Sequence, residues 1–391
     1  MTRTKQWILT LLTAALAGFA GAALAQDIVI GAAIAQTGPA SSLGSGEVDA
    51  LKLFEKQVND AGGIMGHKLK IVLLDTASDP SKAVLDVRKL ITEDNALAVV
   101  CCTTSPESLA VIDTVQRAGV PNISLAASAS IVQPASDRHW VFKTPPLDSV
   151  MVSAEVKDMV AQGVKTLGFI GFNDAYGQGG LNELKKALPG TGIDLLDTES
   201  FARTDTNLSS QASKLAEAKP DAILIWAIPP GGNVAQKALQ DAGYQGIFYQ
   251  SYGMTNETFL RLGGASLNGT RLSVLPVIVH DSLPSSLPFA SVVQDFVRTY
   301  QAAYGSAPSS FAGHAWDAGL ILEAASKQVL ASTSPGDVKA FRSGLRDAIE
   351  GLHGFQAVDG TFDFSPTDHS GLGSTSAVMV TVQDGTYRPV Q

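Results

Sequence analysis

Small hydroxyl residues follow two apolar runs of the sequence, and their positions are suited to anion binding. The run 96–102 is followed by hydroxyls that end at Ser105, and the run 120–127 is followed by Ser128. Hydroxyls and free N–H groups at the start of a helix attract an anion such as a carboxylate. Both serines therefore indicate one crevice for a small anion. The alternative is that Ser105 is only a helix cap and Ser128 only a turn residue.

Other chemistry has little support in the sequence. It contains no G-x-S-x-G nucleophile elbow, and no paired C-x-x-C or H-E-x-x-H motif. We therefore expect no catalytic residue, no metal site and no cofactor. We interpret His314 as a packing residue and His369, in a polar turn, as exposed to solvent. The adjacent Cys101 and Cys102 could form a vicinal disulfide, but two thiols packed at a strand end is the preferred interpretation.

The composition indicates an exported, acidic protein with a large buried core. Arg3 and Lys5 precede an apolar segment that ends at Ala25, a pattern typical of a cleavable signal peptide over residues 1–25. The chain has 37 acidic and 28 basic residues and lacks basic tracts, so nucleic acid is not an expected partner. A length of 391 residues exceeds one ordinary core and favours two lobes.

Strand and helix patterns alternate along the chain, which predicts an α/β protein with parallel sheets. The pair Pro145-Pro146 interrupts the alternation and marks a lobe boundary. The expected strands are 27–35, 68–75, 96–102, 120–127, 140–144, 166–172, 193–198, 222–228, 246–250, 272–279, 360–364 and 377–382. The expected helices are 47–60, 80–93, 106–118, 148–161, 176–188, 207–218, 231–242, 289–304, 310–331 and 335–350.

A set of short motifs, taken in order and spacing, resembles the leucine/isoleucine/valine receptor family of periplasmic substrate-binding proteins. The motifs are QTGP (36–39), NDAGGI (59–64), TS (104–105), AGVPNIS (118–124), FKTP (142–145), NDAYG (173–177) and AWDA (315–318). The resemblance covers the mature chain and implies the two-lobed type I periplasmic binding fold. Each lobe is then a mainly parallel sheet flanked by helices, and three crossover segments join the lobes around a ligand cleft.

The resemblance also implies a domain division and partners. The N-terminal lobe is expected to contain residues 26–144 plus 277–355, and the C-terminal lobe residues 145–276 plus 356–391. The implied protein is a periplasmic monomer without enzymatic activity that delivers a small molecule to the membrane permease of an ABC transporter. A ligand-sensing subunit of a membrane receptor is an alternative with the same fold.

The resemblance and the neighbouring aromatic residues together give a set of ligand contacts. Ser105 and Tyr176 lie at family contact positions in the first and second lobe, and Leu43 lies where the family often covers the apolar end of its ligand. The expected contacts are Leu43, Ser105, Ala126, Ala127, Ser128, Tyr176, Trp226, Tyr252 and Phe311.

Tyr252 decides the expected class of ligand. Amino-acid-binding relatives have an acidic side chain at this position, which pairs with the ammonium group of the ligand. A buried ammonium without that partner would cost several kcal/mol. Asp148 and Asp174 could replace the acid, but both are interpreted as helix caps. Trp226 and Phe311 are expected as aromatic walls, and the alternative is that they belong to the core. As walls they favour an aromatic carboxylate or aromatic 2-oxo acid such as benzoylformate, phenylpyruvate or hydroxybenzoate; branched-chain amino acids are the alternative ligands.

Overall fold

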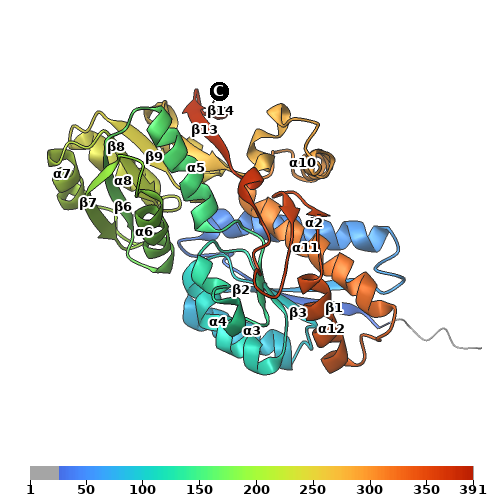
Figure 1. The fold of residues 1–391 in the computed structure, drawn as a ribbon. Helices are drawn as coiled ribbons and strands as arrows, with labels where there is room; N and C mark the ends of the chain where they lie inside the picture. Colours follow the sequence, from blue (N-terminus) through green and yellow to red (C-terminus); the bar gives the residue numbers. More distant parts are fainter. Residues whose placement is uncertain (1–25, 391) are drawn as a thin grey trace, which may run out of the picture.

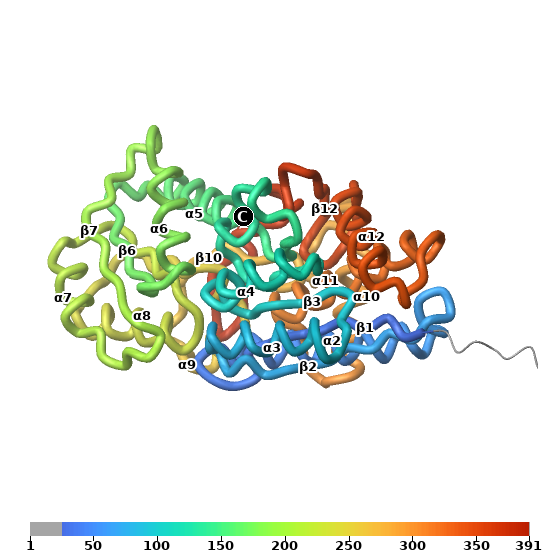
Figure 2. Tube along the Cα trace, turned by 90° about the horizontal axis from the view of Figure 1, so that it is seen from below, coloured from blue at the N-terminus to red at the C-terminus, as the bar shows by residue number. Residues whose placement is uncertain are grey.

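The computed structural model describes residues 26–390 and divides them into two α/β lobes that lie side by side (Figures 1 and 2). The predicted signal peptide, residues 1–25, lies outside the described residues. In Figure 1 the second lobe, in green and yellow, is at the left, and a red segment from near the C-terminus runs between the lobes. Within residues 26–390, no helix combines the length and apolar character needed to span a membrane.

The first lobe is built on a five-stranded parallel sheet in the order β2-β1-β3-β4-β5. Helices α3 and α4 pack together on one face of the sheet, and α2 and α11 on the other, so β3 is buried throughout. The strands are β1 (Ile28–Ile34), β2 (Leu69–Asp75), β3 (Ala98–Cys101), β4 (Asn122–Ser124) and β5 (Val141–Lys143). The helices are α2 (Ser41–Asp60), α3 (Pro80–Thr92), α4 (Ser105–Ala118), α10 (Ala290–Tyr304), α11 (Ser310–Leu330) and α12 (Val338–Glu350).

The second lobe has a seven-stranded sheet in the order β14-β13-β10-β9-β8-β6-β7, in which β13 pairs antiparallel with both β10 and β14 and the other pairs are parallel. Helices α5 and α6 pack together, as do α7 and α8. The strands are β6 (Thr166–Phe172), β7 (Asp194–Phe201), β8 (Ala222–Trp226), β9 (Ile247–Gln250), β10 (Arg271–Val274), β13 (Val378–Gln383) and β14 (Thr386–Pro389). The helices are α5 (Asp148–Ala161), α6 (Ala175–Ala187), α7 (Ser209–Glu217), α8 (Gly231–Asp241) and α9 (Glu257–Gly263).

The two sheets share one strand order at their parallel cores. In each, the first strand along the chain (β1 or β6) lies between the second and the third. The connections therefore leave in opposite directions at this point, which opens a crevice at the carboxyl ends of the strands. This shared topology places loops of both lobes where a ligand can be held between them.

The third crossing between the lobes lies after Leu372, later than the boundary at residues 355/356 expected from the sequence. The hairpin β11 (Phe355–Gln356) and β12 (Thr361–Phe362) is followed by a segment that stays with the first lobe. The N–H groups of Val358 and Asp359 donate to Asp317 of α11 over 2.7 and 2.8 Å. Only β13 then pairs with β10 of the second lobe.

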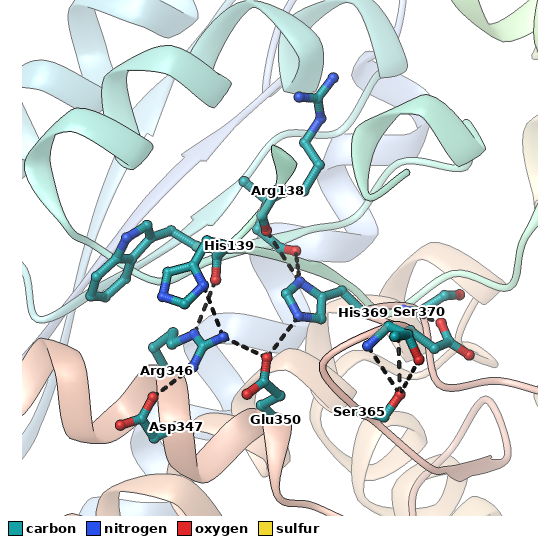
Figure 3. Close-up of polar contacts among 12 residues, drawn as sticks. Arg138, His139, Arg346, Asp347, Glu350, Ser365, His369 and Ser370 are labelled. Atoms are coloured by element: carbon teal, nitrogen blue, oxygen red, sulfur yellow. Dashed lines mark hydrogen bonds and ion pairs between the residues drawn. The ribbon is translucent and has the colours of Figure 1, made fainter. Parts of the chain in front are cut away.

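His369 fixes this late segment to the first lobe and is 1% exposed, so the expectation of a solvent-exposed side chain was wrong. Figure 3 shows its ring between the backbone of Arg138 and the side chain of Glu350. Nδ1 lies 3.1 Å from the carbonyl oxygen of Arg138 and 2.9 Å from that of Val141, and Nε2 lies 3.2 Å from a Glu350 carboxylate oxygen. The ring also stacks on Phe142 of β5, with centroids 4.3 Å apart. These contacts tie the segment before the third crossing to the strand before the first.

Candidate ligand-binding site

A cavity of about 360 Å³, which includes its open mouth, lies between the two lobes. The first lobe contributes Leu43, Thr103, Thr104, Ser105, Leu125, Ala126, Ala127, Phe311 and His314. The second lobe contributes Tyr176, Arg203, Ile228, Tyr252 and Gly253, and Pro145 comes from the first crossing segment. Most of these residues follow the carboxyl end of a strand or begin a helix.

The turn from β3 into α4 forms one wall of the cavity. Thr104 is the N-cap of α4, and Glu107 completes a capping box by accepting a hydrogen bond from the Thr104 N–H at 3.1 Å. Ser105 is therefore the first residue of the helix and not its cap. Its hydroxyl oxygen accepts a hydrogen bond from the Ser128 N–H at 3.2 Å, which leaves the hydroxyl hydrogen available for a ligand.

The end of β3 carries a bond that the preferred interpretation of the sequence did not include. The structure joins Cys101 and Cys102 in a vicinal disulfide, in place of the two expected thiols. Both residues are fully buried. The Cys102 N–H donates to the hydroxyl of Ser108 at 3.1 Å, so the backbone next to the lining residue Thr103 is held by α4.

Arg203 gives the cavity a positive charge that the sequence reasoning missed. Its Nε donates to Asp174 Oδ2 over 2.6 Å, and its guanidinium carbon lies 4.4 Å from the ring centroid of Phe172. Its Nη1 is buried and has no hydrogen-bond partner among the described residues. No local sequence pattern marks this role, because it depends on loops after β6 and β7 that meet only in the folded lobe.

Two tyrosines form the wall of the second lobe. The Tyr176 hydroxyl donates to Ser251 Oγ at 3.0 Å, and burial raises the pKa of Tyr176 well above its ordinary value. The Tyr252 hydroxyl donates to Asp148 Oδ1 at 3.3 Å, and burial raises its pKa likewise. Both phenols are thus neutral, and their orientation is set by buried partners.

Trp226 and Ser128 were expected to contact the ligand, but neither lines the cavity. Trp226 is fully buried in β8, and its ring lies behind Tyr176 and Tyr252 with centroid distances of 5.8 and 6.1 Å. It supports the tyrosine wall instead of forming it. The Ser128 hydroxyl bonds to that of Ser130 at 2.8 Å and borders a separate groove beside α6. The other seven expected contacts do line the cavity.

Comparison with known proteins agrees with this architecture. The family described as "Periplasmic binding protein" matches residues 27–386 of the chain. The chain belongs to this family. The expected type I, two-lobed fold of the leucine/isoleucine/valine receptor kind is thereby confirmed, and members of the family bind substrates without transforming them.

Three relatives of this periplasmic binding protein show the range of similarity. An extracellular ligand-binding receptor from Rhodopseudomonas palustris is 32% identical with a TM-score of 0.89, over 94% of this chain and 100% of that one. "Leu/Ile/Val-binding protein homolog 3" of Brucella melitensis is 28% identical over 66% of this chain and 69% of its own. A solute-binding protein of an R. palustris ABC transporter, solved with benzoate, has a TM-score of 0.79 at 22% identity, over 93% of this chain and 95% of that one.

The two carboxylates considered as ammonium partners both accept hydrogen bonds in this periplasmic binding protein, although Oδ2 of Asp148 is buried without a partner among the described residues. Asp174 pairs with Arg203 and caps α6 by accepting from the Tyr176 N–H at 2.8 Å. Asp148 is fully buried at the start of α5 and does not cap it. Burial raises the pKa of Asp148 to about 6, although the charge of Lys143 and the hydrogen bond from Tyr252 oppose the increase. Neither acid lines the cavity.

His314 lies in the lining and is not only the packing residue expected from the sequence. Its Nδ1 lies 2.6 Å from Asp359 Oδ2, and its ring meets that of Phe311 edge-on at 5.6 Å. Burial, with the charge of Lys143, lowers the pKa of His314 to about 3. Within residues 26–390 no group of three or more His, Cys, Asp or Glu side chains could hold a metal ion.

Proposed function

We propose that this periplasmic binding protein is the substrate-binding component of an ABC importer and that its ligand is an aromatic carboxylate or aromatic 2-oxo acid. The observation that carries the proposal is the charge of the cavity. Among the described residues, the lining contains Arg203 and no Asp or Glu. A cation with a free, buried N–H group favours an anion, because removal of the ligand from water is then compensated by a charge-assisted hydrogen bond.

The start of α4 is the second element suited to a carboxylate. Ser105 offers its hydroxyl there, and the positive end of the helix dipole adds to the attraction. Burial raises the pKa of Glu107, and hydrogen bonds together with the charge of Arg203 offset part of the increase. Arg203 is therefore close to the start of α4. A carboxylate between Ser105 and Arg203 would contact both lobes and stabilise their closed arrangement.

A buried acid behind the cavity does not oppose an anion. Glu47 accepts a hydrogen bond from the Thr103 hydroxyl at 2.6 Å. Burial raises the pKa of Glu47 to about 8, against the opposing effect of that hydrogen bond. Its carboxyl group is therefore mostly uncharged at neutral pH, so Glu47 adds little negative charge to the wall of the first lobe.

The remaining lining supports a ligand with one aromatic ring. Tyr176, Tyr252 and Phe311 present three rings, and Leu43 and Ile228 add aliphatic surface. Aromatic side chains gain more than their buried area when they meet another ring edge-on or with an offset. The benzoate complex of the R. palustris protein gives this ligand class a precedent within the fold.

Branched-chain amino acids are the second candidate, because curated relatives are named for leucine, isoleucine and valine. Leu43 and Ile228 would suit their side chains. Their ammonium group, however, would have to displace Arg203 from Asp174 or reach Asp148 behind Tyr252. Displacing Arg203 leaves a largely buried charge without its partner, which costs roughly 3–5 kcal/mol when a buried pair is broken, and Asp148 lies outside the lining of the cavity.

Calorimetric titration of the mature protein tests this function. The protein should first be unfolded, washed and refolded, so that any ligand retained during purification is removed. We expect benzoate, phenylacetate or phenylpyruvate to bind and to raise the midpoint temperature of unfolding. A ligand at 100 times its dissociation constant increases the free energy of unfolding by about 2.7 kcal/mol. Binding of leucine or isoleucine without binding of any aromatic acid would refute the ligand class while leaving the family assignment intact.

A further inference from the structure

His314 and Asp359 form a buried pair at the cavity for which the carboxylate site has no use. His314 is 1% exposed and Asp359 is fully buried. Asp359 Oδ2 is taken by the imidazole Nδ1, and Asp359 Oδ1 is buried without a partner among the described residues. Since Nδ1 is occupied, Nε2 is the ring nitrogen of His314 that remains available to a ligand.

The surroundings of the pair determine which hydrogen atoms it carries. Both oxygens of Asp317 accept backbone N–H groups, from Val358 and from Asp359 itself, so the two carboxyl groups lie close together. Burial raises the pKa of Asp359 and of Asp317, and the charge of Asp359 raises that of Asp317 further. Two adjacent buried negative charges are unfavourable. Asp317 is the better stabilised anion because each of its oxygens accepts a backbone N–H, whereas Asp359 Oδ1 has no partner among the described residues, so the proton is assigned to the pair of Asp359 and His314.

This proton determines the role of Nε2. If Asp359 holds the proton, its O–H donates to Nδ1 and the single hydrogen of the neutral imidazole is on Nε2. If His314 holds it, both ring nitrogens carry hydrogen. In each case Nε2–H is a hydrogen-bond donor at the cavity. The Phe311 ring, edge-on to the imidazole, keeps this orientation.

His314 and Arg203 lie in different parts of the lining. Arg203 follows β7, the outer strand of the second sheet, and is close to the start of α4. The His314 carbonyl accepts a hydrogen bond from the Thr144 hydroxyl at 3.0 Å, at the first crossing segment. That segment leaves β5, which is two strands away from β3, the strand that leads into α4. A ring held between the two residues would therefore have one polar contact at each end.

We propose that His314 donates a hydrogen bond from Nε2 to a second oxygen of the ligand, remote from its carboxylate. This inference rests on the proposed function and makes it narrower. The ligand is then an aromatic acid that carries a hydroxyl or carbonyl oxygen on the far side of its ring, and not an unsubstituted aromatic acid. His314 is the residue that determines this selectivity, and Asp359 positions it.

A cycle of ligands and variants tests the inference by calorimetry. The ligands are benzoate, 4-methylbenzoate and 4-hydroxybenzoate, with the 2- and 3-hydroxy isomers as further probes. Wild type should prefer the best hydroxy isomer over 4-methylbenzoate about tenfold, as one neutral hydrogen bond predicts. In H314L this preference for the hydroxy isomer should disappear. H314Q should keep part of the preference, because its amide N–H can replace Nε2–H.

Each other outcome is decisive. No preference for any hydroxy isomer in wild type overturns the inference, as does a preference that persists in H314L. If H314L weakens the binding of all ligands equally, His314 either binds the carboxylate or only stabilises the fold, and the inference is overturned as well. If H314L does not fold, the comparison of ligands in wild type and H314Q decides. If wild type binds no aromatic acid, the proposed function fails and the inference with it; if it binds benzoate and the hydroxy acids equally, only the inference fails.

Discussion

Replacement of Arg203 by glutamine changes the charge of the cavity with little change in shape. Nη1 of Arg203 is buried without a partner among the described residues, and the side chain is 18% exposed. The substitution removes the positive charge and the free donor together. Asp174 keeps two other hydrogen bonds, from the N–H groups of Tyr176 and Gly177, so the cap of α6 should survive.

The expected loss of affinity follows from the kind of contact removed. A hydrogen bond to a charged group contributes about 1.5–3 kcal/mol, and Arg203 is covered well enough that solvent screens it only in part. R203Q should therefore weaken benzoate-class ligands roughly 10- to 150-fold in titration calorimetry. The uncharged analogue benzamide, of nearly the same shape, should bind both proteins with similar affinity.

Asp174→Asn is the matched control, because it removes the acid that neutralises Arg203 and keeps a good N-cap residue. D174N should bind an aromatic carboxylate as tightly as wild type or more tightly, which is opposite in direction to R203Q. Thermal unfolding of each variant without ligand checks that the fold is retained. Unchanged benzoate affinity in R203Q, or equal loss of benzoate and benzamide, would refute the role of Arg203 as the anion-binding cation.

Four further substitutions test other parts of the structure. Ser105→Ala should weaken the binding of an aromatic acid about tenfold in titration calorimetry. Ser128→Ala should change this affinity less than about twofold, because the Ser128 hydroxyl borders the outer groove. Equal effects of the two substitutions would contradict the assigned lining. Burial raises the pKa of Glu155 from its ordinary value of 4.5 to about 8. Between these two pH values the folded protein therefore keeps the Glu155 proton, whereas the unfolded chain releases it. Wild-type stability should then fall as pH rises from about 5 to 8, and Glu155→Gln should lose less over this range in urea unfolding; parallel pH profiles would argue against a protonated Glu155. His369→Leu leaves two backbone carbonyls without their donor and should lower the free energy of unfolding by about 1–3 kcal/mol, and an unchanged value would mean that water replaces the imidazole.

Most of the regular elements could be predicted from the sequence, because their patterns are local. The predicted helix 148–161 and strand 166–172 coincide with α5 and β6. Helix α2 begins at Ser41 and not at the predicted Glu47, since Gly44 and Gly46 hide its start. Gly44 is required there by tertiary contact: a Cβ atom would lie 2.0 Å from the carbonyl oxygen of Ala35. The short helix α9 and strand β14 were not predicted, and both depend on packing against other parts of the lobe.

Only part of the candidate site could be predicted from such local patterns. In the first lobe, Ser105, Ala126 and Ala127 follow apolar strands directly, and this order along the chain is itself the signal. In the second lobe, Tyr176 and Tyr252 were expected, but Trp226 lies behind them in β8. Periodicity shows that a strand residue is buried, but it cannot show on which face of the sheet the ligand lies.

Arg203 and His314 were missed for a different reason, which bears on ligand choice in this fold. Each side chain is placed by a carboxylate distant in sequence, Asp174 for Arg203 and Asp359 for His314. Local patterns report how a residue folds, whereas the charge of a cavity is a sum over loops from both lobes. The sequence has Tyr252 where relatives have an acid, which indicates only that the ammonium group of a ligand would lack a partner. It is the positive charge of Arg203 that favours an anion. Two sequences with the same pattern of strands and helices could therefore fold around cavities of opposite charge. The ligand class of such a protein follows from a few pairs of residues that are distant in sequence.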